Sequence, residues 1–147
     1  MTVTMNEEDR MQQVADTLSP FADALKMRTV SHSREKVVGE MVVEPWLGNR
    51  NGVLHGGALM SLADNVCGTA TFLNLGEGQS TVTLESKTNF MRPIRIGDVA
   101  RATVTPYHVG RTTMIWEVKV TRGDGKLCAV VTQTQLVLEW KESSAAE

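Results

Sequence analysis

Hydrophobic and polar residues recur with two different periods along the chain, and these periods separate helical from extended segments. Near the N-terminus, apolar residues share one helical stripe: Met11, Val14, Leu18, Phe21 and Leu25. Asn6 precedes Glu7, Glu8 and Asp9, which is typical of a helix start because a side-chain cap and early acids satisfy the exposed amides. Proline lacks an amide hydrogen and favours the first turn, so a break is expected at Ser19-Pro20. Residues 1–27 are therefore predicted to form a kinked helical arm.

The next two segments have different periods. Residues 36–44 alternate as a half-buried strand does, with one face formed by Val37, Gly39, Met41 and Val43 and the other by Lys36, Glu40 and Glu44. Residues 53–75 are too long for a strand and are apolar on every side, which predicts a helix surrounded by protein. The polar residues and glycines within this segment argue against a membrane span.

Four further segments are rich in Val, Thr and aromatic residues and predict strands at 80–92, 99–107, 112–122 and 126–140. We expect them to follow one another as a meander, because glycines at Gly97-Asp98, Gly110 and Gly123-Asp124-Gly125 allow the positive φ of tight turns. On the last two strands, the apolar faces would carry Met114, Trp116, Val118 and Val120, and Val130, Leu136, Leu138 and Trp140. Such a sheet needs a cover, and the central helix is the one all-round apolar candidate. The prediction is an α+β fold in which the sheet curls about this helix.

Length and composition change this picture little. The 147 residues suit a single domain, 1–147, with residues 142–147 expected as a frayed polar tail. A net charge of −2 gives no overall attraction to nucleic acid or to an anionic membrane, so neither is expected as a partner. Cys67 and Cys128 have no disulfide or zinc-ligand spacing, and His32 and His108 lack a partner at metal-ligand spacing. With no signal-peptide pattern at the start, a cytoplasmic location is predicted.

Asp64 is the residue that draws attention to chemistry. It is the single formally charged side chain between Val53 and Leu75, and a buried carboxylate costs on the order of several kcal/mol unless it is paired or wetted. It is either a catalytic group or a polar contact at a helix edge or subunit interface. His55-Gly56-Gly57 stands directly before the helix, where free amides could hold developing negative charge. Asp64 lies about two turns further on, so base and oxyanion donor are expected to face one cleft.

These residues occur within longer motifs. The run Asn49-Arg50-Asn51-Gly52-Val53-Leu54-His55-Gly56-Gly57, followed by Leu62-Ala63-Asp64-Asn65, resembles the signature of hotdog-fold acyl-CoA thioesterases of the PaaI-like (phenylacetic-acid-pathway) type. The resemblance extends from about Ser19 onward, through Val82-Thr83-Leu84-Glu85, Phe90-Met91-Arg92-Pro93, Gly97-Asp98, Gly110-Arg111-Thr112 and the Gly-Asp-Gly hairpin.

The resemblance implies a fold, an assembly and roles for several residues. It implies a hotdog fold, in which a curved antiparallel sheet wraps the long helix, and a homo-oligomer in which two subunits pair edge to edge and share active sites, with a tetramer expected. Asp64 would act as general base or nucleophile, and the Gly56 amide would hold the oxyanion. Asn49 and His55 would orient the thioester or the attacking water. Thr83 would help to place that water from the partner subunit.

Further positions would contact the substrate. Gly110-Arg111-Thr112 resembles a turn that meets the CoA phosphates, to which an arginine can donate a fork of hydrogen bonds; the alternative is an ordinary hairpin. Arg92 and Arg95 would add to a basic rim, or one of them would be a solvated surface residue. Gly57 and Val82 complete the expected substrate contacts.

The predicted activity is hydrolysis of a small aryl- or medium-chain acyl-CoA to free acid and CoA, with water as acceptor and no metal or redox cofactor. Two alternatives stay open at this point. One is a hotdog hydratase or dehydratase, which would also use a histidine and a carboxylate. The other is a non-catalytic subunit that binds acyl-CoA, against which the intact Asn49, His55, Gly56 and Asp64 argue.

Overall fold

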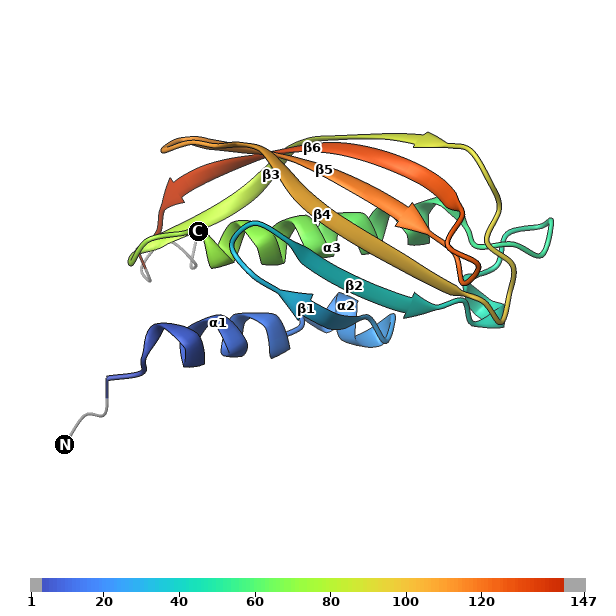
Figure 1. Ribbon diagram of the computed structural model, residues 1–147, viewed down its shortest axis with the longest axis horizontal. Coiled ribbons are helices and arrows are strands. Elements are labelled where there is room, and N and C mark those ends of the chain that lie inside the picture. Colours follow the sequence, from blue (N-terminus) through green and yellow to red (C-terminus); the bar gives the residue numbers. More distant parts are fainter. Residues whose placement is uncertain (1–3, 142–147) are drawn as a thin grey trace.

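The structure, a computed structural model, describes residues 4–141, and the predicted tail at 142–147 lies outside them. Its helices are α1 (Glu7–Asp16), α2 (Pro20–Ala24), the 3-10 helix η1 (Pro45–Leu47) and α3 (Gly56–Leu73). Its strands are β1 (Arg28–His32), β2 (Val37–Val42), β3 (Gln79–Phe90), β4 (Val99–Val109), β5 (Thr113–Thr121) and β6 (Leu127–Glu139). All six strands form one antiparallel sheet that curves over α3, and α1 and α2 lie against the opposite side of that helix (Figure 1). The predicted α+β hotdog architecture with an N-terminal helical arm is confirmed.

The arm breaks where the sequence predicts. The Asp9 amide donates to Asn6 Oδ1 at 2.8 Å, which caps α1. Pro20 occupies the first turn of α2, and the Ala22 amide donates to Ser19 Oγ at 3.2 Å. The Thr29 hydroxyl donates to the Ala15 carbonyl at 2.8 Å, which ties the arm to the edge of the sheet.

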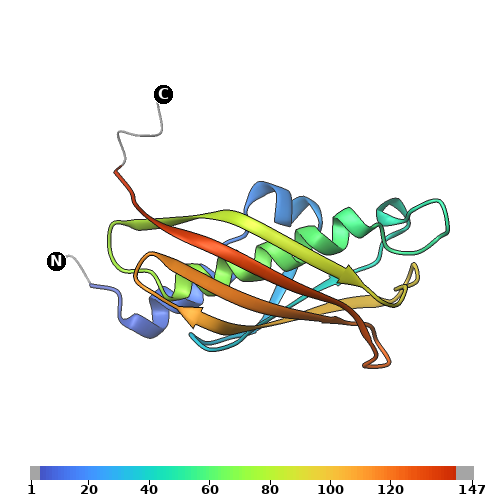
Figure 2. The same ribbon diagram turned by 90° about the horizontal axis from the view of Figure 1, so that it is seen from above.

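The order of the strands corrects the expected four-strand meander. The sheet runs β1-β2-β4-β5-β6-β3, so β4, β5 and β6 form a meander but β3 pairs with β6 instead of β4. Seen from above, β3 is the outer strand on one side of the sheet, and β6, β5 and β4 follow it inward (Figure 2). The segment at 91–98 therefore crosses from one side of the sheet to the other. Hydrophobic patterning predicts that segments are strands, but it carries no record of which strands are neighbours.

Strand β1 was missed in the sequence, and the polar face of β2 differs from the prediction. β1 is a short strand at the second edge of the sheet, and three of its five residues are exposed, which weakens its hydrophobic signal. The expected apolar face of β2 is confirmed, with Val37 and Met41 fully buried. Glu40, expected on the polar face, is only 7% exposed, because Arg28 and Arg101 on the neighbouring strands form ion pairs with its two carboxylate oxygens.

Strand β3 carries a β-bulge between Thr83 and Glu85. Before the bulge, Thr83 pairs with Gln135 of β6, and after it Ser86 pairs with Gln133. Residues paired across an antiparallel ladder share a face of the sheet, and both glutamines are buried on the helix-facing side. The bulge therefore lets β3 turn polar side chains toward α3 on both sides of Leu84.

The core face of the sheet agrees with the prediction on β5 but not on β6. Met114, Trp116, Val118 and Val120 of β5 are buried as expected. Between Ala129 and Gln135 the buried residues of β6 are the odd-numbered ones, whereas the predicted face is only partly buried or exposed: Val130, Leu136, Leu138 and Trp140. Gln133 and Gln135 sit among the odd-numbered residues, and their polarity hid the true core face from the hydrophobic pattern.

Helix α3 is not surrounded by protein in the single chain. One face packs on the sheet through fully or almost fully buried residues such as Leu62, Val66 and Cys67. The opposite face is exposed at Gly57, Met60, Asp64 and Phe72. The prediction of an all-round buried helix is wrong for the monomer, and the uncovered stripe contains Asp64. Of the described helices, none is both long enough and apolar enough to cross a membrane.

The turn glycines serve two purposes. Gly97 and Gly125 have φ of +90° and +81°, as the sequence predicts. Gly110 and Gly123 do not have positive φ. At Gly110 a Cβ would lie 2.4 Å from Nε2 of His108, so a close contact explains the absence of a side chain there.

Gly39 of β2 sets the distance between the sheet and α3, and a matched pair of substitutions can test this. A Cβ at Gly39 would lie 2.6 Å from Cγ1 of Val66, a stiff β-branched side chain in the helix. We expect Gly39→Ala to lower the free energy of unfolding by roughly 1–3 kcal/mol through overpacking. Gly68→Ala is the control, since nothing lies within 4 Å of its Cβ, and it should raise stability by about 0.5–1 kcal/mol. Urea denaturation of both variants measures the difference, and equal stabilities would contradict the close approach.

Candidate active site

Asp64 lies on the uncovered face of α3 with its carboxylate turned toward β3 and β6. Its Oδ1 accepts hydrogen bonds from Thr83 Oγ1 at 2.9 Å and from Gln133 Nε2 at 2.8 Å. Within residues 4–141, no salt bridge joins Asp64 to a basic side chain. Neutral donors thus hold the carboxylate, and its charge is not cancelled by a counter-ion.

Thr83 bonds Asp64 within the same chain, and its predicted role across a subunit contact stays a prediction. Its hydroxyl donates to Asp64 and accepts from Gln135 Nε2 at 3.0 Å. Gln135 is fixed in turn, because its Oε1 accepts from Thr81 Oγ1 at 3.0 Å. Thr83 faces the helix because it pairs with Gln135, which is buried on the helix-facing side of the sheet, and sequence alone does not show this pairing.

Two glutamines of β6, Gln133 and Gln135, belong to this site and were missed in the sequence. They are 0% and 1% exposed, which is unusual for long polar side chains. Their signal was present as two glutamines at alternating positions in a strand that is otherwise made mostly of apolar residues and threonine. Gln133 Oε1 is buried without a hydrogen-bond partner among the described residues, as are Ser86 Oγ and Thr88 Oγ1. Leaving one such group unpaired costs about 1–3 kcal/mol, so this arrangement requires an explanation beyond packing.

The loop before α3 is organised by two of the predicted residues. Asn49 Oδ1 accepts from the amides of Asn51 at 2.9 Å and Val53 at 3.3 Å, which closes the turn at 49–53. His55 is the N-cap of α3, and its Nδ1 accepts from the Gly57 amide at 2.9 Å. Because Nδ1 accepts this bond, the ring proton lies on Nε2, where it can donate to a ligand.

Gly56 is left as a free donor at the first position of α3. The amides of Ala58 and Leu59 donate to the His55 carbonyl, and the Gly57 amide is used by the His55 ring. Within the described part of the chain, no acceptor is recorded for the Gly56 amide. Gly56 lines a cavity of about 380 Å³ together with Asn49, Phe90 and Arg92. The free amide lies at the positive end of the helix dipole, where a negatively charged oxygen could be held.

Gly56 and Asp64 do not face one cleft within a single chain, which corrects the prediction. Asp64 lines a different cavity, of about 470 Å³, between α3 and α1. Eight residues of α-helix separate the two positions by about 12 Å, much more than the reach of one thioester carbonyl. The prediction counted helical turns correctly but neglected the rise along the axis.

The cavity beside Asp64 is mostly apolar and is lined on one side by the N-terminal arm. Its α3 wall is formed by Asn65, Gly68, Thr69 and Phe72, which follow Asp64 along the helix. Its α1 side and the linker that follows contribute Gln13, Val14, Thr17, Leu18 and Ser19. The arm residues were not among the predicted site residues, because nothing in the sequence relates 13–19 to 64–72.

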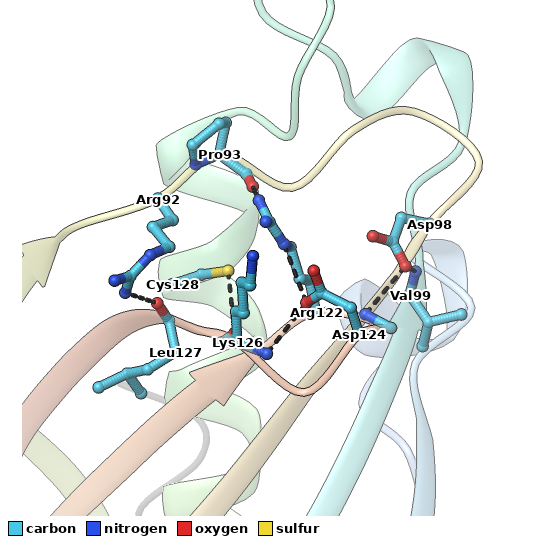
Figure 3. Close-up of polar contacts among 10 residues, drawn as sticks. Arg92, Pro93, Asp98, Val99, Arg122, Asp124, Lys126, Leu127 and Cys128 are labelled. Carbon is cyan, nitrogen blue, oxygen red and sulfur yellow. Dashed lines mark hydrogen bonds and ion pairs between the residues drawn. The ribbon is translucent and has the colours of Figure 1, made fainter.

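Arg92 lies beside Gly56, as a basic rim requires, but its guanidinium also has a structural contact. Arg92 Nη1 donates to the Leu127 carbonyl at 2.8 Å, and Arg122 Nη1 donates to the Pro93 carbonyl at 3.0 Å (Figure 3). These bonds fasten the segment at 91–98 to the start of β6. Arg122 also bonds Asp124 at 3.1 Å; this contact raises the pKa of the arginine and lowers the pKa of the aspartate. Arg95 is exposed.

The predicted phosphate turn, Gly110-Arg111-Thr112, lies at the other end of the sheet from Gly56. Thr113, which follows this turn, pairs with Leu136, and Leu136 pairs with Val82 of β3. Val82 is 44% exposed at the sheet edge, one residue before Thr83. The chain thus sorts the predicted residues into two groups. One group contains Asn49, His55, Gly56, Gly57 and Arg92, and the other contains Asp64, Val82, Thr83, Gly110, Arg111 and Thr112.

Both cysteines are buried and are unsuited to nucleophilic chemistry. Cys67 is one helical turn from Asp64, and burial, followed by the nearby Asp64 charge, raises the pKa of its thiol far above the usual range. Burial also raises the pKa of the Cys128 thiol. The residues that the structure describes contain no cluster of three or more His, Cys, Asp or Glu side chains placed to hold a metal ion.

A curved antiparallel sheet around one long helix is the arrangement of the hotdog fold. The family model of the thioesterase superfamily matches residues 51–129. The protein PA1618 of Pseudomonas aeruginosa is 30% identical over 139 residues, which cover 94% of this chain and 95% of that protein. The chain therefore belongs to the thioesterase superfamily.

Solved structures agree with this assignment. A mutant of PA1618, called a thioesterase, superposes with a TM-score of 0.78 at 27% identity and covers 93% of this chain and 96% of its own. The PaaI protein of Escherichia coli gives a TM-score of 0.81 at 23% identity over 90% of this chain and 94% of its own, which shows the shared fold. Other curated relatives are matched over less than two thirds of their length. One is the 1,4-dihydroxy-2-naphthoyl-CoA hydrolase of Escherichia coli, 33% identical over 59% of this chain and 63% of its own.

The capping bond of His55 predicts a stability effect that is separate from any catalytic role. His55→Ala removes the acceptor for the Gly57 amide and should lower the free energy of unfolding by about 1 kcal/mol. His55→Asn keeps a side-chain acceptor at the N-cap and should lie close to the wild type. Chemical denaturation measures both values. If the two variants are equally unstable, the Nδ1 contact does not cap α3.

Proposed function

We propose that the protein hydrolyses acyl-CoA thioesters, with Asp64 as the group that activates or delivers the nucleophile. The observation that carries this proposal is the Asp64 carboxylate, held by two neutral donors beside an apolar cavity and without a counter-ion among the described residues. Membership of the thioesterase superfamily supports the reaction class. The coenzyme A thioester cleaved by the Escherichia coli relative supports the substrate class.

The proposed site is completed by a second copy of the chain. β3 is the outer strand of the sheet, and its exposed residues include Val82 at 44%, Leu84 at 58% and Phe90 at 53%. A long exposed edge with apolar side chains favours pairing with another strand. Two copies paired antiparallel through β3 make a self-complementary contact, as twofold symmetry requires. The same contact would cover the exposed face of α3, including Met60.

Such a dimer explains why the predicted residues fall into two groups. Antiparallel pairing reverses the direction of the second α3, so its N-terminus lies alongside the middle or end of the first. The group around Gly56 in one protomer then faces the group around Asp64 in the other. In this pairing the base and the oxyanion donor come from two different helices. The separation of about 12 Å along a single α3 therefore no longer keeps them from acting on one carbonyl. A tetramer made from two such dimers is our proposal for the full assembly.

The chemistry follows from the two groups. In one route Asp64 takes a proton from water, and the water oxygen attacks the thioester carbonyl carbon. In the other route Asp64 attacks directly, forms a mixed anhydride and releases CoA, and water then hydrolyses the anhydride. In both routes the Gly56 amide and the Nε2 proton of His55 would stabilise the oxyanion before the carbon–sulfur bond breaks. Each route ends with free acid and CoA, and the proposed reaction needs no metal or redox cofactor.

The cavity between α1 and α3 is the proposed acyl pocket. It begins at Asp64 and continues past Gly68 to Phe72, which is about 12 Å along the helix axis. Its apolar wall suits an uncharged acyl group, and its volume of about 470 Å³ suits an aryl or medium-chain acyl group. Arg111 of the same protomer and Arg92 of its partner would lie at the mouth and bind the CoA phosphates. We propose a cytoplasmic location, in keeping with two buried free cysteines.

Removing the Asp64 carboxylate tests the activity. Asp64→Asn should lower kcat by about 10²-fold or more, because the amide cannot act as base or nucleophile. Release of free CoA from benzoyl-, phenylacetyl- and octanoyl-CoA, followed with a thiol reagent, measures the effect. Equal release by the variant and the wild type would overturn the role of Asp64, and no release by the wild type from any of the three would overturn the proposed activity.

A complementation arm of the same experiment tests the shared site. Gly56→Pro removes the proposed oxyanion donor at a helix position that tolerates proline, and it should also be inactive. Coexpressed Asp64→Asn and Gly56→Pro chains form dimers in which one of two sites keeps both groups. For random pairing, about a quarter of the wild-type activity should return, because half of the dimers are mixed. Activity that stays absent in purified mixed dimers would place both groups in a single chain.

Gly68 offers a test of the acyl pocket. Gly68→Leu places a side chain into the cavity from a position with open space around its Cβ, so the fold should tolerate it. We expect kcat/KM for octanoyl- and phenylacetyl-CoA to fall by about 10-fold or more, while that for acetyl-CoA changes little, because methylene-sized differences in a pocket are worth about 1–3 kcal/mol. A uniform loss for all three substrates would place the acyl group elsewhere.

A further inference from the structure

Gln133 is the side chain that links the core of the sheet to the carboxylate of α3. It is fully buried on β6, and its Nε2 lies 2.8 Å from Asp64 Oδ1 and 3.4 Å from Thr83 Oγ1. Asp64 and Gln133 are far apart in sequence, so this contact exists only because the sheet curves around the helix. Gln135, two residues further on, is equally buried but contacts Thr83 instead of the carboxylate.

The orientation of the Gln133 amide is set by Asp64. An ionised carboxylate can only accept hydrogen bonds, so the amide must present its nitrogen. This leaves Gln133 Oε1 buried without a partner among residues 4–141. Gln135 shows that an amide in this layer can be satisfied at both ends, because its Nε2 donates to Thr83 and its Oε1 accepts from Thr81. Gln133 therefore directs Nε2 toward the carboxylate, and its Oε1 is left without a hydrogen-bond partner among the described residues.

The two donors also decide which carboxylate oxygen is free. The terminal torsion of an aspartate is soft, so an isolated carboxylate rotates easily. Thr83 and Gln133 both donate to Oδ1, and Oδ2 receives no hydrogen bond from the described residues. Holding Oδ1 from two strands leaves Oδ2 as the oxygen that can meet a water molecule or a carbonyl carbon.

We propose that Gln133 is a positioning residue that holds Asp64 Oδ1 and thereby aims Oδ2 at the reacting atom. This proposal rests on the proposed function for its catalytic consequence, but the contact itself can be tested without activity. A purely structural glutamine would affect folding and would act independently of Asp64. A positioning glutamine would affect turnover, and only while the carboxylate is present.

The test uses Gln133→Met, which keeps length and approximate volume and removes the donor, with Gln135→Met as the matched control. Gln133→Met should lower kcat by about 10- to 100-fold, the range for misplacement of a reacting group, and should leave KM within about twofold. Gln135→Met should cause a loss at least about 10-fold smaller, because it acts on Thr83 alone. In the Asp64→Asn background, Gln133→Met should cause no further loss. Additive losses, or equal losses for the two methionine variants, would overturn the proposal.

An activity-independent measurement separates this proposal from the proposed function. In protein labelled with ¹³C at aspartate carboxyl carbons, the Asp64 signal, assigned through its loss in Asp64→Asn, should move in Gln133→Met at fixed pH and move less in Gln135→Met. An unmoved signal overturns the contact even if the enzyme is active. A wild type without thioesterase activity overturns the proposed function, and the carboxyl signal then still decides whether Gln133 holds Asp64. If Gln133→Met does not fold, Gln133→Leu also removes the donor with a shorter apolar side chain and gives the same comparison.

Discussion

The rise of an α-helix is the constraint on which the rest of this site depends. Gly56 and Asp64 lie on one helix, and about 1.5 Å per residue keeps them much too far apart to act on one carbonyl. The chain does not shorten this distance by a kink or a bulge in α3, which runs unbroken from Gly56 to Leu73. In the dimer that we propose, a second helix running in the opposite direction resolves the conflict, and the exposed edge of β3 is suited to supply it. The proposed chemistry therefore depends on the proposed dimer, because the rise per residue of α3 keeps one chain from supplying both groups to the same carbonyl.

Neutral hydrogen bonds take the place that a counter-ion would have at this carboxylate. A lysine or arginine beside Asp64 would compensate its charge more strongly but would also compete for the oxygen that has to react. Thr83 and Gln133 compensate the charge from one side only. The cost appears elsewhere, in the buried and unpaired Oε1 of Gln133. A site in which one oxygen is held and the other is left open follows naturally from this one-sided arrangement.

Much of the fold and part of the site could be predicted from the sequence, and the failures have physical causes. The helix cap at Asn6, the break before Pro20 and the buried face of β5 follow from local rules and are confirmed. The position of β3 beyond β6 depends on long-range pairing, which local patterns do not record. The core face of β6 was misread because Gln133 and Gln135 look like surface residues, although both are buried, one bonded to Asp64 and the other to Thr83. Residue type and motif were enough to select Asp64 and Gly56 from the sequence. Only the structure shows that they line different cavities. Their catalytic roles stay predictions.

The bulge at Leu84 divides β3 into two halves whose side-chain alternation is set independently. In a regular strand of this sequence, strict alternation after Thr83 would turn Glu85 and Lys87 toward the helix and place charges beneath α3. With the bulge, Ser86 and Thr88 face inward instead, while Thr81 and Thr83 keep their own phase. Loss of the Leu84 codon would remove the bulge but keep the same residues inward, because Glu85 would then follow Thr83 directly and Ser86 would still pair with Gln133. The inward-facing residues of β3 are consequently fixed by its pairing with β6, and Leu84 is the residue whose loss that pairing can absorb.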